Sequence, residues 1–449
     1  MNYTEAVNYL LTLGRELASP SQTRATKFDL NNIRVLAAGM GDPQARFRSV
    51  HIAGTNGKGS TAAMLDAILR SAGYRTGLYT SPHLERINER IRVNGAEIGD
   101  AEFAEAFSRL HAAIEKMLST GELAAHPTFF ECVTAMAFDV FAREAVEFAV
   151  LEVGMGGRLD ATNLVTPQVC AITQIAFDHE NFLGHSIEQI AGEKAGIIKP
   201  GVPVVSAAEN PEARAVIQRK ARELGAPLVE IDAEYRVKVT ARESGFYDAA
   251  VSDLAERTLI SLRPRLPGRF QVRNAVTAFA VGRILAEKGF GRIDEHAIAE
   301  GIAGVHWPGR LERLQELPVV YLDGAHNPAG ARELAAFWKE NFSGRRIFLV
   351  YGAVRDKAVD EVAGILFSRA AKVFITAAHQ PRAISAEALA EMTAHLATSV
   401  EVVPDAAEAM ERALAVAEPA DAIFTTGSLY LVGDLRRWWH SRTTAVNRD

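Results

Sequence analysis

The sequence has few cysteines. Only Cys132 and Cys170 occur among its 449 residues, and both stand in apolar surroundings. Two cysteines at this separation are too few for a disulfide framework and do not form a CxxC metal site. We therefore expect two buried, reduced thiols.

Long hydrophobic runs are also absent. No stretch approaches the roughly 18 consecutive apolar residues needed to span a bilayer. The first residues, MNYTEAVNYLLTLGRELAS, carry acids and no basic stretch ahead of an apolar run, so they do not read as a secretory signal. These features predict a cytoplasmic protein without a membrane partner.

Neither sign of charge dominates. The formal net charge is −6 at pH 7, with acids and bases mixed along the chain. A nucleic-acid-binding surface usually shows a basic excess, so a DNA- or RNA-dependent ATPase is disfavoured and no nucleic-acid partner is expected. An anionic small ligand is still compatible, because phosphate sites are built locally from backbone N–H groups and one or two cations.

What the chain does contain is a repeated α/β pattern. Apolar residues make up 48% and charged residues 23%, and 449 residues are too many for one hydrophobic core, so we expect two domains or three. Short apolar strands followed by glycine-containing turns and helical stretches predict parallel α/β units. In the first part, the expected strands lie at residues 50–53, 146–154, 168–175 and 202–207.

The pattern changes twice further along. Between about 235 and 267, short alternating segments predict antiparallel strands inserted before a helix. At about residue 305 a Pro-Gly pair and a reset in composition predict a domain boundary, beyond which strands and helices alternate again. The predicted fold class is α/β: an N-terminal P-loop ATPase-type domain with a mostly parallel sheet (1–304) and a smaller C-terminal Rossmann-like doubly wound domain (305–449).

The segment GTNGKGS lies between a predicted strand and a predicted helix. Glycines let the backbone approach phosphates, and a helix N-terminus presents unpaired N–H groups. Lys58 is expected to reach the β- and γ-phosphates and Ser60 to lie near Mg²⁺. The spacing differs from the common GxxxxGK[ST], and a glycine turn without a ligand is the alternative. The expected nucleotide contacts are Gly54, Thr55, Asn56, Gly57, Lys58, Gly59 and Ser60.

Two residues near strand ends are candidate metal ligands. Glu152 ends an otherwise apolar strand, where a carboxylate is costly unless it is paired or binds a cation. Strand ends in parallel sheets face the ligand crevice, which favours Glu152 as a Mg²⁺ ligand over a salt bridge. His179 follows another strand end, but the residues alone leave a packing role open; Asp178 beside it is a candidate to orient the imidazole.

The phosphate loop resembles the ATP loop of the Mur ligase superfamily. Further motifs narrow the resemblance to the folylpolyglutamate synthase/dihydrofolate synthase family, and they run in order from residue 51 to residue 437. They are TSPHLERINERI, LEVGMGGRLDATN, AFDHENFLG, EKAGIIKPG, LPGRFQVRNA, WPGRLE, YLDGAHNPAG and TTGSLYLVGDLR. The resemblance implies a ligase that uses ATP and Mg²⁺ to activate a folate or dihydropteroate carboxylate as an acyl phosphate, and then joins L-glutamate to it.

The same resemblance implies a set of metal ligands. Ser60, Ser81 and Glu152 would hold one ion, and His179 would hold a second ion that Glu152 bridges. Lys194, in EKAGIIKPG, matches a lysine that is carbamylated by CO₂ in this family and would then serve the second metal. From the residues alone, a surface lysine is favoured at this position.

Other site residues follow from the resemblance. Arg310 is expected near the phosphates, Asp323 near the ribose, and Asn274 and His326 as further nucleotide contacts. Lys58, His179, Lys194 and Arg310 are the expected catalytic residues. The expected substrate contacts are Ser81, Pro82, Thr128, Phe130, Arg158 and Asp160, although Phe130 also fits the start of a buried helix. The resemblance further implies a monomer and activation by K⁺.

Several alternatives stay open. A Mur ligase acting on a UDP-sugar peptide would carry a separate UDP-binding domain ahead of the ATP loop, and a loop at residue 54 leaves no room for one. A non-ligating P-loop nucleotide-binding protein is the alternative of another class, but no guanine-reading NKxD motif is found. Relatives act on dihydropteroate, on folates or on both, and the motifs do not distinguish these substrates.

Overall fold

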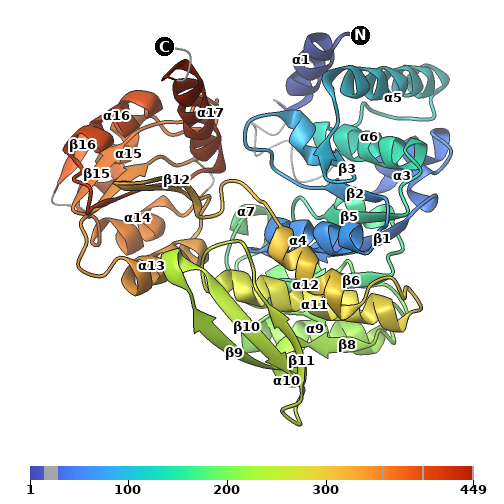
Figure 1. Cartoon of the computed structure of the whole chain (residues 1–449). Helices are drawn as coiled ribbons and strands as arrows, with labels where there is room; N and C mark the ends of the chain where they lie inside the picture. The colour runs from blue at the N-terminus through green and yellow to red at the C-terminus, as the bar shows by residue number, and fades with distance from the viewer. Residues whose placement is uncertain (15–28, 356, 397–398, 447–449) are drawn as a thin grey trace.

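The computed structural model describes residues 1–14, 29–355, 357–396 and 399–446. Two lobes are visible in Figure 1: one built from the earlier part of the chain, in blue to yellow, and one from the later part, in orange to red. Each lobe is organised around its own β-sheet. The α/β class and the division into two sheet domains, both predicted from the sequence, are confirmed.

The first domain contains an eight-stranded sheet in the order β4-β3-β2-β5-β1-β6-β7-β8. In this order, the strands β2, β5, β1, β6, β7 and β8 pair in parallel. The strands β3 and β4 add an antiparallel edge beside β2. The strands are β1 (Arg48–Ala53), β2 (Thr76–Tyr79), β3 (Ile91–Val93), β4 (Ala96–Glu97), β5 (Phe148–Glu152), β6 (Val169–Ile172), β7 (Val204–Ser206) and β8 (Leu228–Glu230). All four strands expected in this region are present.

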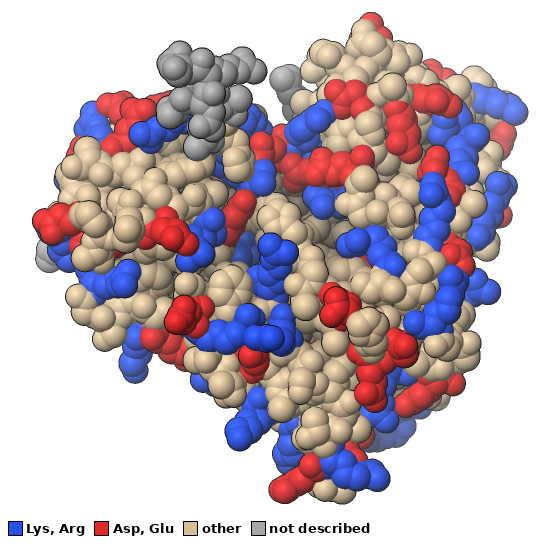
Figure 2. Space-filling view, in the orientation of Figure 1, with Lys and Arg blue, Asp and Glu red and all other residues tan. Residues whose placement is uncertain are grey.

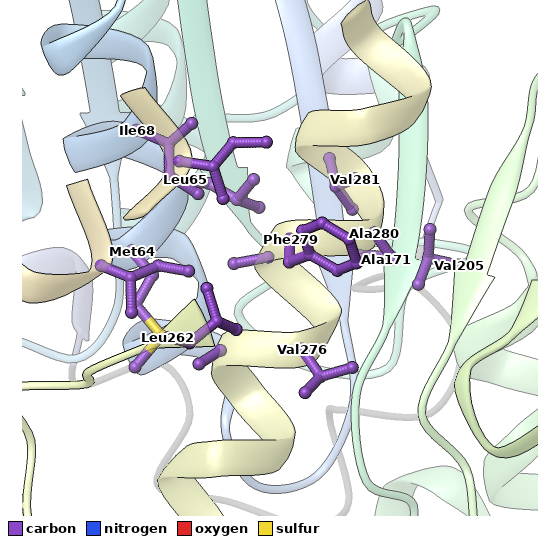
Figure 3. Packing of buried hydrophobic residues seen from close by; sticks show 14 of the residues in the cluster. Met64, Leu65, Ile68, Ala171, Val205, Leu262, Val276, Phe279, Ala280 and Val281 are labelled. Carbon is purple, nitrogen blue, oxygen red and sulfur yellow. The ribbon is translucent and has the colours of Figure 1, made fainter. Parts of the chain in front are cut away.

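Helices cover both faces of this sheet. The side chains of a buried strand alternate between the two faces, so each face carries apolar side chains that must be covered. Phe148 and Val150 of β5 join one core, while Ala149 and Leu151 join the other. In Figure 3, Leu65 of α4 and Phe279 of α11 lie in the first core. The helices are α1 (Tyr3–Gly14), α3 (Asn31–Gly39), α4 (Lys58–Ser71), α5 (Asp100–Thr120), α6 (Phe129–Arg143), α7 (Glu180–Leu183), α8 (Ile187–Ala195), α9 (Pro211–Glu223), α10 (Ile231–Glu234), α11 (Phe270–Glu287) and α12 (Glu295–Gly304).

A small antiparallel sheet is attached to the first domain. Its order is β11-β10-β9, with β9 at Arg236–Ala241, β10 at Tyr247–Ser252 and β11 at Thr258–Leu262. It projects at the bottom of Figure 1 and contributes buried residues to the core around α11. The prediction of antiparallel strands between 235 and 267 is therefore confirmed.

The second domain has a six-stranded sheet in the order β12-β13-β17-β14-β15-β16, in which only the edge strand β12 is antiparallel. Its strands are β12 (Glu312–Glu316), β13 (Val319–Leu322), β14 (Ile347–Tyr351), β15 (Lys372–Ile375), β16 (Val400–Val402) and β17 (Ala422–Thr426). One face packs against α13 (Pro328–Asn341), α14 (Val359–Phe367) and α15 (Ala386–Thr393), and the other against α16 (Ala406–Val416) and α17 (Leu429–Val446). Helices on both faces make this a doubly wound sheet.

Two expectations from the composition can be compared with this fold. Cys132 and Cys170 are both buried, and neither takes part in a disulfide. Within the described part of the chain, no helix combines the length and the apolar character needed to cross a membrane.

Candidate active site

A crevice with a cavity volume of about 440 Å³ lies where the two domains meet. Figure 2 shows the surface hollowed between the two lobes. The carboxyl ends of parallel strands from both sheets open into the crevice, which is where ligands bind in open α/β sheets. The predicted site residues that line it are Gly54 to Ser60, Ser81, Pro82, Glu152, His179, Lys194, Asn274, Arg310, Asp323 and His326.

The loop after β1 is held in a shape that only its glycines allow. A Cβ on Gly54 would lie 1.8 Å from Oγ1 of Thr173, and one on Gly57 would lie 2.3 Å from Oδ1 of Asn274. Both glycines also have positive φ angles, of 148° and 87°. The loop ends at the N-terminus of α4, whose first N–H groups are available to an anion.

Two lysine ammonium groups converge on one carbonyl of this loop. Nζ of Lys58 donates to the carbonyl oxygens of Gly54 and Thr55, at 3.0 and 2.9 Å, and Nζ of Lys194 donates to that of Gly54 at 2.8 Å. Burial lowers the pKa of both lysines, and together with the charge of Lys58 it brings the pKa of Lys194 to about 7. An ammonium group held at this loop favours an incoming polyanion such as a nucleotide phosphate.

Glu152 ends β5 beside the first turn of α4. Its side chain is buried, and Oε2 accepts a hydrogen bond from the backbone N–H of Ser81 at 3.1 Å. Burial raises the pKa of this carboxyl, and among the described residues no basic side chain lies within ion-pair distance of it. A buried carboxylate without a close counter-ion suits a hard divalent cation.

The hydroxyl of Ser60 lies in the same part of the crevice and accepts a hydrogen bond from Nε2 of the buried Gln271 at 3.3 Å. Glu152, Ser60 and Ser81 all line the crevice, and their side chains carry oxygen atoms of the kind that Mg²⁺ takes as ligands. Within the described residues, no group of three or more His, Cys, Asp or Glu side chains gathers as a metal site. The donor set is therefore one carboxylate with hydroxyl groups, and a nucleotide would have to supply further oxygens.

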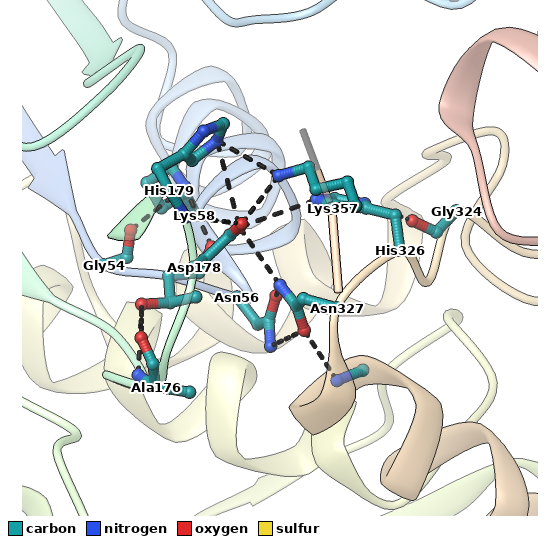
Figure 4. A network of polar contacts seen from close by, with 12 residues as sticks. Gly54, Asn56, Lys58, Ala176, Asp178, His179, Gly324, His326, Asn327 and Lys357 are labelled. Atoms are coloured by element: carbon teal, nitrogen blue, oxygen red, sulfur yellow. Dashed lines mark hydrogen bonds and ion pairs between the residues drawn. The ribbon is translucent and has the colours of Figure 1, made fainter. Parts of the chain in front are cut away.

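Asp178 is the centre of a polar network between the domains (Figure 4). Its carboxylate lies 2.6 Å from Nζ of Lys357, accepts a hydrogen bond from Nδ2 of Asn327 at 3.2 Å, and lies 3.7 Å from Nε2 of His326. Burial acts to raise the pKa of Asp178, but hydrogen bonding to His326 and the charges of His179 and Lys357 outweigh it and lower this pKa strongly. One first-domain carboxylate is thus paired with three second-domain side chains.

His179 lies beside this network. Its Nε2 is 3.2 Å from Nζ of Lys357 and 3.9 Å from the carboxylate of Asp178. The expected second metal would bind at this imidazole, but here an ammonium group stands next to the nitrogen that would coordinate it. A second ion bound through Nε2 of His179 would take the place that the Lys357 ammonium occupies beside this nitrogen.

A second pair of contacts joins the domains at the phosphate loop. The side-chain amides of Asn56 and Asn327 exchange two hydrogen bonds, at 3.2 and 2.9 Å. Asn327 also caps α13 by accepting from the N–H of Gly330 at 2.9 Å. The position of α13 is therefore connected directly to the phosphate loop.

Asp323 and Arg310 face the crevice from the second domain. The buried carboxylate of Asp323 accepts the N–H groups of Leu311 and Ala325, both at 2.9 Å, and burial raises its pKa. Arg310 has its Nη1 at 3.2 Å from the carbonyl of Gly309. The WPGRLE segment and the loop after β13 are thereby held together at the rim of the crevice.

Two of the expected substrate contacts organise their own loop instead. Asp160 is buried, and its carboxylate accepts the N–H groups of Gly154, Met155 and Thr162, each at 3.0 Å. Arg158 is exposed and pairs with Glu193 at 2.8 Å. Neither is among the residues that line the crevice, and their contact with a substrate stays a prediction.

Thr128 and Phe130 also lie outside the crevice lining. Oγ1 of Thr128 accepts from the N–H of Glu131 at 3.3 Å and caps α6. The ring of Phe130 packs near that of Tyr79, with centroids 6.0 Å apart, and against the backbone of Gly154. Phe130 is the second residue of α6, and its contact with a substrate stays a prediction.

Two site residues were missed in the sequence. Lys357 lies six residues after the end of β14, and a lysine in the connection that follows a buried strand was the available signal. Gln271, which contacts Ser60 and Asn274, is a fully buried polar residue in the first turn of α11. Neither signal indicates which partner the side chain meets.

Comparison with known proteins identifies the relatives of this chain. A model of the Mur ligase middle domain matches residues 52–282, and a model of the Mur ligase glutamate ligase domain matches residues 309–429. A Bacillus subtilis dihydrofolate synthase/folylpolyglutamate synthase is 37% identical over 410 residues, 91% of this chain and 94% of that protein.

Two solved structures share the complete architecture. Escherichia coli FolC in complex with DHPP and ADP matches with a TM-score of 0.85 at 31% identity, covering 99% of both chains. The Yersinia pestis bifunctional folylpolyglutamate synthase/dihydrofolate synthase, complexed with AMPPNP and a Mn ion, matches with a TM-score of 0.82 at 31% identity, covering 98% of both. This chain belongs to the folylpolyglutamate synthase/dihydrofolate synthase family of Mur ligases.

Proposed function

We propose that this ATP-dependent ligase joins L-glutamate to a folate, to dihydropteroate, or to both, through an acyl phosphate. The observation that carries the proposal is the arrangement of Lys58 and Lys194 on the phosphate loop, opposite a buried Glu152. The Mur ligase architecture, with a second domain closing the crevice, supports the same conclusion.

The proposed reaction has two steps. A carboxylate oxygen of the substrate attacks the γ-phosphorus of ATP, the bond to the bridging oxygen breaks, and ADP leaves. The glutamate amine then attacks the acyl carbon, loses a proton, and expels inorganic phosphate to leave an amide. Lys58 and Arg310 would offset the repulsion between the two anions in the first step.

Closure of the crevice has its own role in this proposal. An acyl phosphate is hydrolysed by water, so the site must keep water out until the amine arrives. Contacts of Asp178 with Lys357 and of Asn56 with Asn327 hold the second domain over the phosphate loop.

The proposed boundary between the domains is residue 304/305, between the end of α12 and the start of β12.

Metal binding is proposed on the residues that fit it. Ser60, Ser81 and Glu152 would hold one Mg²⁺, which would neutralise phosphate charge when bound. His179 and Lys194 are proposed for a second ion. A carbamate on Lys194 requires a neutral amine, and a pKa of about 7 provides one near neutral pH. Activation by K⁺ is proposed from the family resemblance alone.

The crevice also extends over an apolar surface. It is lined there by Val237 and Val239 of β9, Val272 and Val276 of α11, and Leu334 of α13. A flat heterocycle suits such a surface, and we propose that the adenine base lies on it. This would place the phosphates towards the N-terminus of α4.

The deciding experiment is a pair of assays on the purified protein. One contains dihydropteroate and the other a tetrahydrofolate, each with ATP, Mg²⁺ and labelled L-glutamate. We expect label in an amide product, and ADP formation that requires both the glutamate and the pterin substrate in at least one assay. ADP formation that is independent of glutamate would overturn the proposal and favour a non-ligating nucleotide hydrolase.

A further inference from the structure

The segment between β2 and β3 connects the crevice to the last helix of the chain. At the crevice end, the backbone N–H of Ser81 holds the Glu152 carboxylate. A few residues later, the same segment lies against α17 of the second domain. Two sequence motifs that are far apart, TSPHLERINERI and TTGSLYLVGDLR, thus meet in space.

This segment has a fixed shape of its own. The carboxylate of Glu89 accepts the N–H groups of Leu84, Glu85 and Arg86, at 2.7, 2.8 and 2.7 Å. Three backbone donors on one carboxylate make a tight turn that moves as a unit. Ser81 lies three residues before this turn, on the same connection between β2 and β3.

Arg436 of α17 is the charged contact with this turn. Its guanidinium pairs with the carboxylate of Glu85, and Nε donates to both oxygens of Glu312 at 3.0 and 3.1 Å. The three side chains are only 22%, 17% and 13% exposed, so the cluster is largely shielded from solvent. Arg437 adds a hydrogen bond to the carbonyl of Glu85 at 3.0 Å.

The backbones of the two domains also touch at this place. A Cβ on Gly433 would lie 2.0 Å from the carbonyl oxygen of Leu84, so no larger residue fits without moving the turn. The side chain of Leu84 packs with the second-domain core and contacts Gly309. The ion pair and the close backbone contact together fix the position of the turn on α17.

We propose that Arg436 is a positioning residue for the ligation reaction, acting through residues 81–86 on Ser81 and Glu152. Correct docking of α17 fixes the turn, and the turn fixes the oxygen atoms that face the nucleotide and its metal ion. Glu85 is the matching residue on the first domain. The kinetic test of this inference, the KM for MgATP, rests on the proposed function. The binding test, the dissociation constant for Mn²⁺, does not depend on that function.

The test compares Arg436→Gln and Glu85→Gln with the unchanged protein. Loss of a group that hydrogen-bonds directly to a metal ligand typically changes metal affinity by roughly 10- to 100-fold. Arg436 acts through the turn, so the lower end of this range is expected. We expect KM for MgATP and the dissociation constant for Mn²⁺, followed by its electron paramagnetic resonance signal, to rise by about 10-fold or more in either variant. The double variant should lose little more than Arg436→Gln alone, because Arg436→Gln already removes the contact with Glu85.

Arg412→Gln is the matched control. Arg412 also pairs with two carboxylates, those of Glu401 and Glu408, but all three lie within the second domain. Its loss should leave KM and Mn²⁺ affinity unchanged. An Arg436→Gln protein that binds Mn²⁺ and MgATP as the unchanged protein does would overturn the inference, even if its melting temperature falls. Absence of glutamate-dependent ADP formation in the unchanged protein would count against the proposed function alone.

Discussion

The two lysines on the phosphate loop have different surroundings and different expected roles. Lys58 starts α4 and is only partly buried, whereas Lys194 comes from α8 and is 4% exposed. Replacement of Lys58 by Ala should remove the cation nearest the phosphates and lower kcat on the order of 10²-fold or more. Turnover measured as glutamate-dependent ADP release tests this. Lys220→Ala, which removes an exposed lysine on α9, is the control and should leave turnover unchanged.

A buried histidine should make stability depend on pH. His51 is fully buried, its ring nitrogen Nε2 lies 2.8 Å from Oγ1 of Thr162, and burial lowers its pKa from 6.5 to about 3. Above pH 6.5 the residue is neutral in both states and has no effect. Below it, the unfolded chain binds a proton that the folded protein does not, so stability falls until about pH 3 is reached.

At pH 5.5 this difference amounts to about 1.4 kcal/mol for one histidine. His51→Gln keeps a hydrogen-bonding group but cannot be protonated, so the midpoint of urea unfolding should fall less between pH 7.5 and 5.5 than in the unchanged protein. His83 has a similarly lowered pKa and should retain its own share of the pH dependence. An identical loss in both proteins would mean that His51 is protonated in the folded state.

Some residues of the site could be predicted because the sequence shows a charged side chain in an apolar segment, where its burial is unfavourable without a partner. Glu152 at the end of an apolar strand needs a partner, and it does face the crevice. Asp160 could not be interpreted in the same way. A carboxylate in a glycine-rich loop serves equally well to bind a ligand or to bind the loop's own N–H groups, and only the fold decides between them.

At the scale of elements, the helices α4 and α12 approach each other closely at Gly301. A Cβ on Gly301 of α12 would lie 2.5 Å from both the Cα and the N of Ile68 in α4. Backbone atoms cannot move aside as a flexible side chain can, so Gly301→Ala should separate the helices and destabilise the first domain by about 1–3 kcal/mol. Chemical unfolding of the purified protein measures the change.

Gly304 ends the same helix and provides the comparison. No atom lies within 4 Å of a Cβ built there, and its backbone is not in the left-handed region. Gly304→Ala should therefore change stability by no more than about 0.5 kcal/mol. Equal effects of the two substitutions would show that the helix contact is not the cause.

Elements with a strong pattern were predictable, and elements defined by their partners were not. The strands β1, β5, β6 and β7 are short apolar runs bounded by turn residues, which the sequence reveals directly. Edge strand β12 follows the Pro-Gly pair and has Leu314 as its single apolar residue, so it has no apolar run to identify it. It is a strand because β13 supplies its hydrogen bonds.

At the scale of the whole molecule, the sequence indicated two domains but not how they face each other. Each sheet places its functional loops at the carboxyl ends of its strands, and this rule applies to either domain separately. The pairing of Asp178 with Lys357 depends on the relative position of two sheets, which no local pattern encodes. Contacts between domains are therefore the part of the site that only the structure reveals.

The buried pair of Asp178 and Lys357 should be a main determinant of domain closure. Their side chains are 10% and 8% exposed, and they lie on different domains. Removing one partner from such a pair leaves an uncompensated buried charge and costs on the order of 3 kcal/mol. Asp178→Asn should therefore shift the protein towards an open arrangement, and small-angle X-ray scattering should show a larger radius of gyration.

A second substitution separates this cause from a general loss of folding. Adding Lys357→Met to Asp178→Asn replaces the unpaired ammonium with an apolar side chain. Because buried ion pairs can be replaced by packed apolar groups, the double variant should recover the compact form. Asp253→Asn, in an exposed pair with Arg257, is the control and should not alter the scattering curve. If Asp178→Asn scatters as the unchanged protein does, the contacts of Asn56 with Asn327 and of α17 with residues 81–86 are sufficient to hold the domains together.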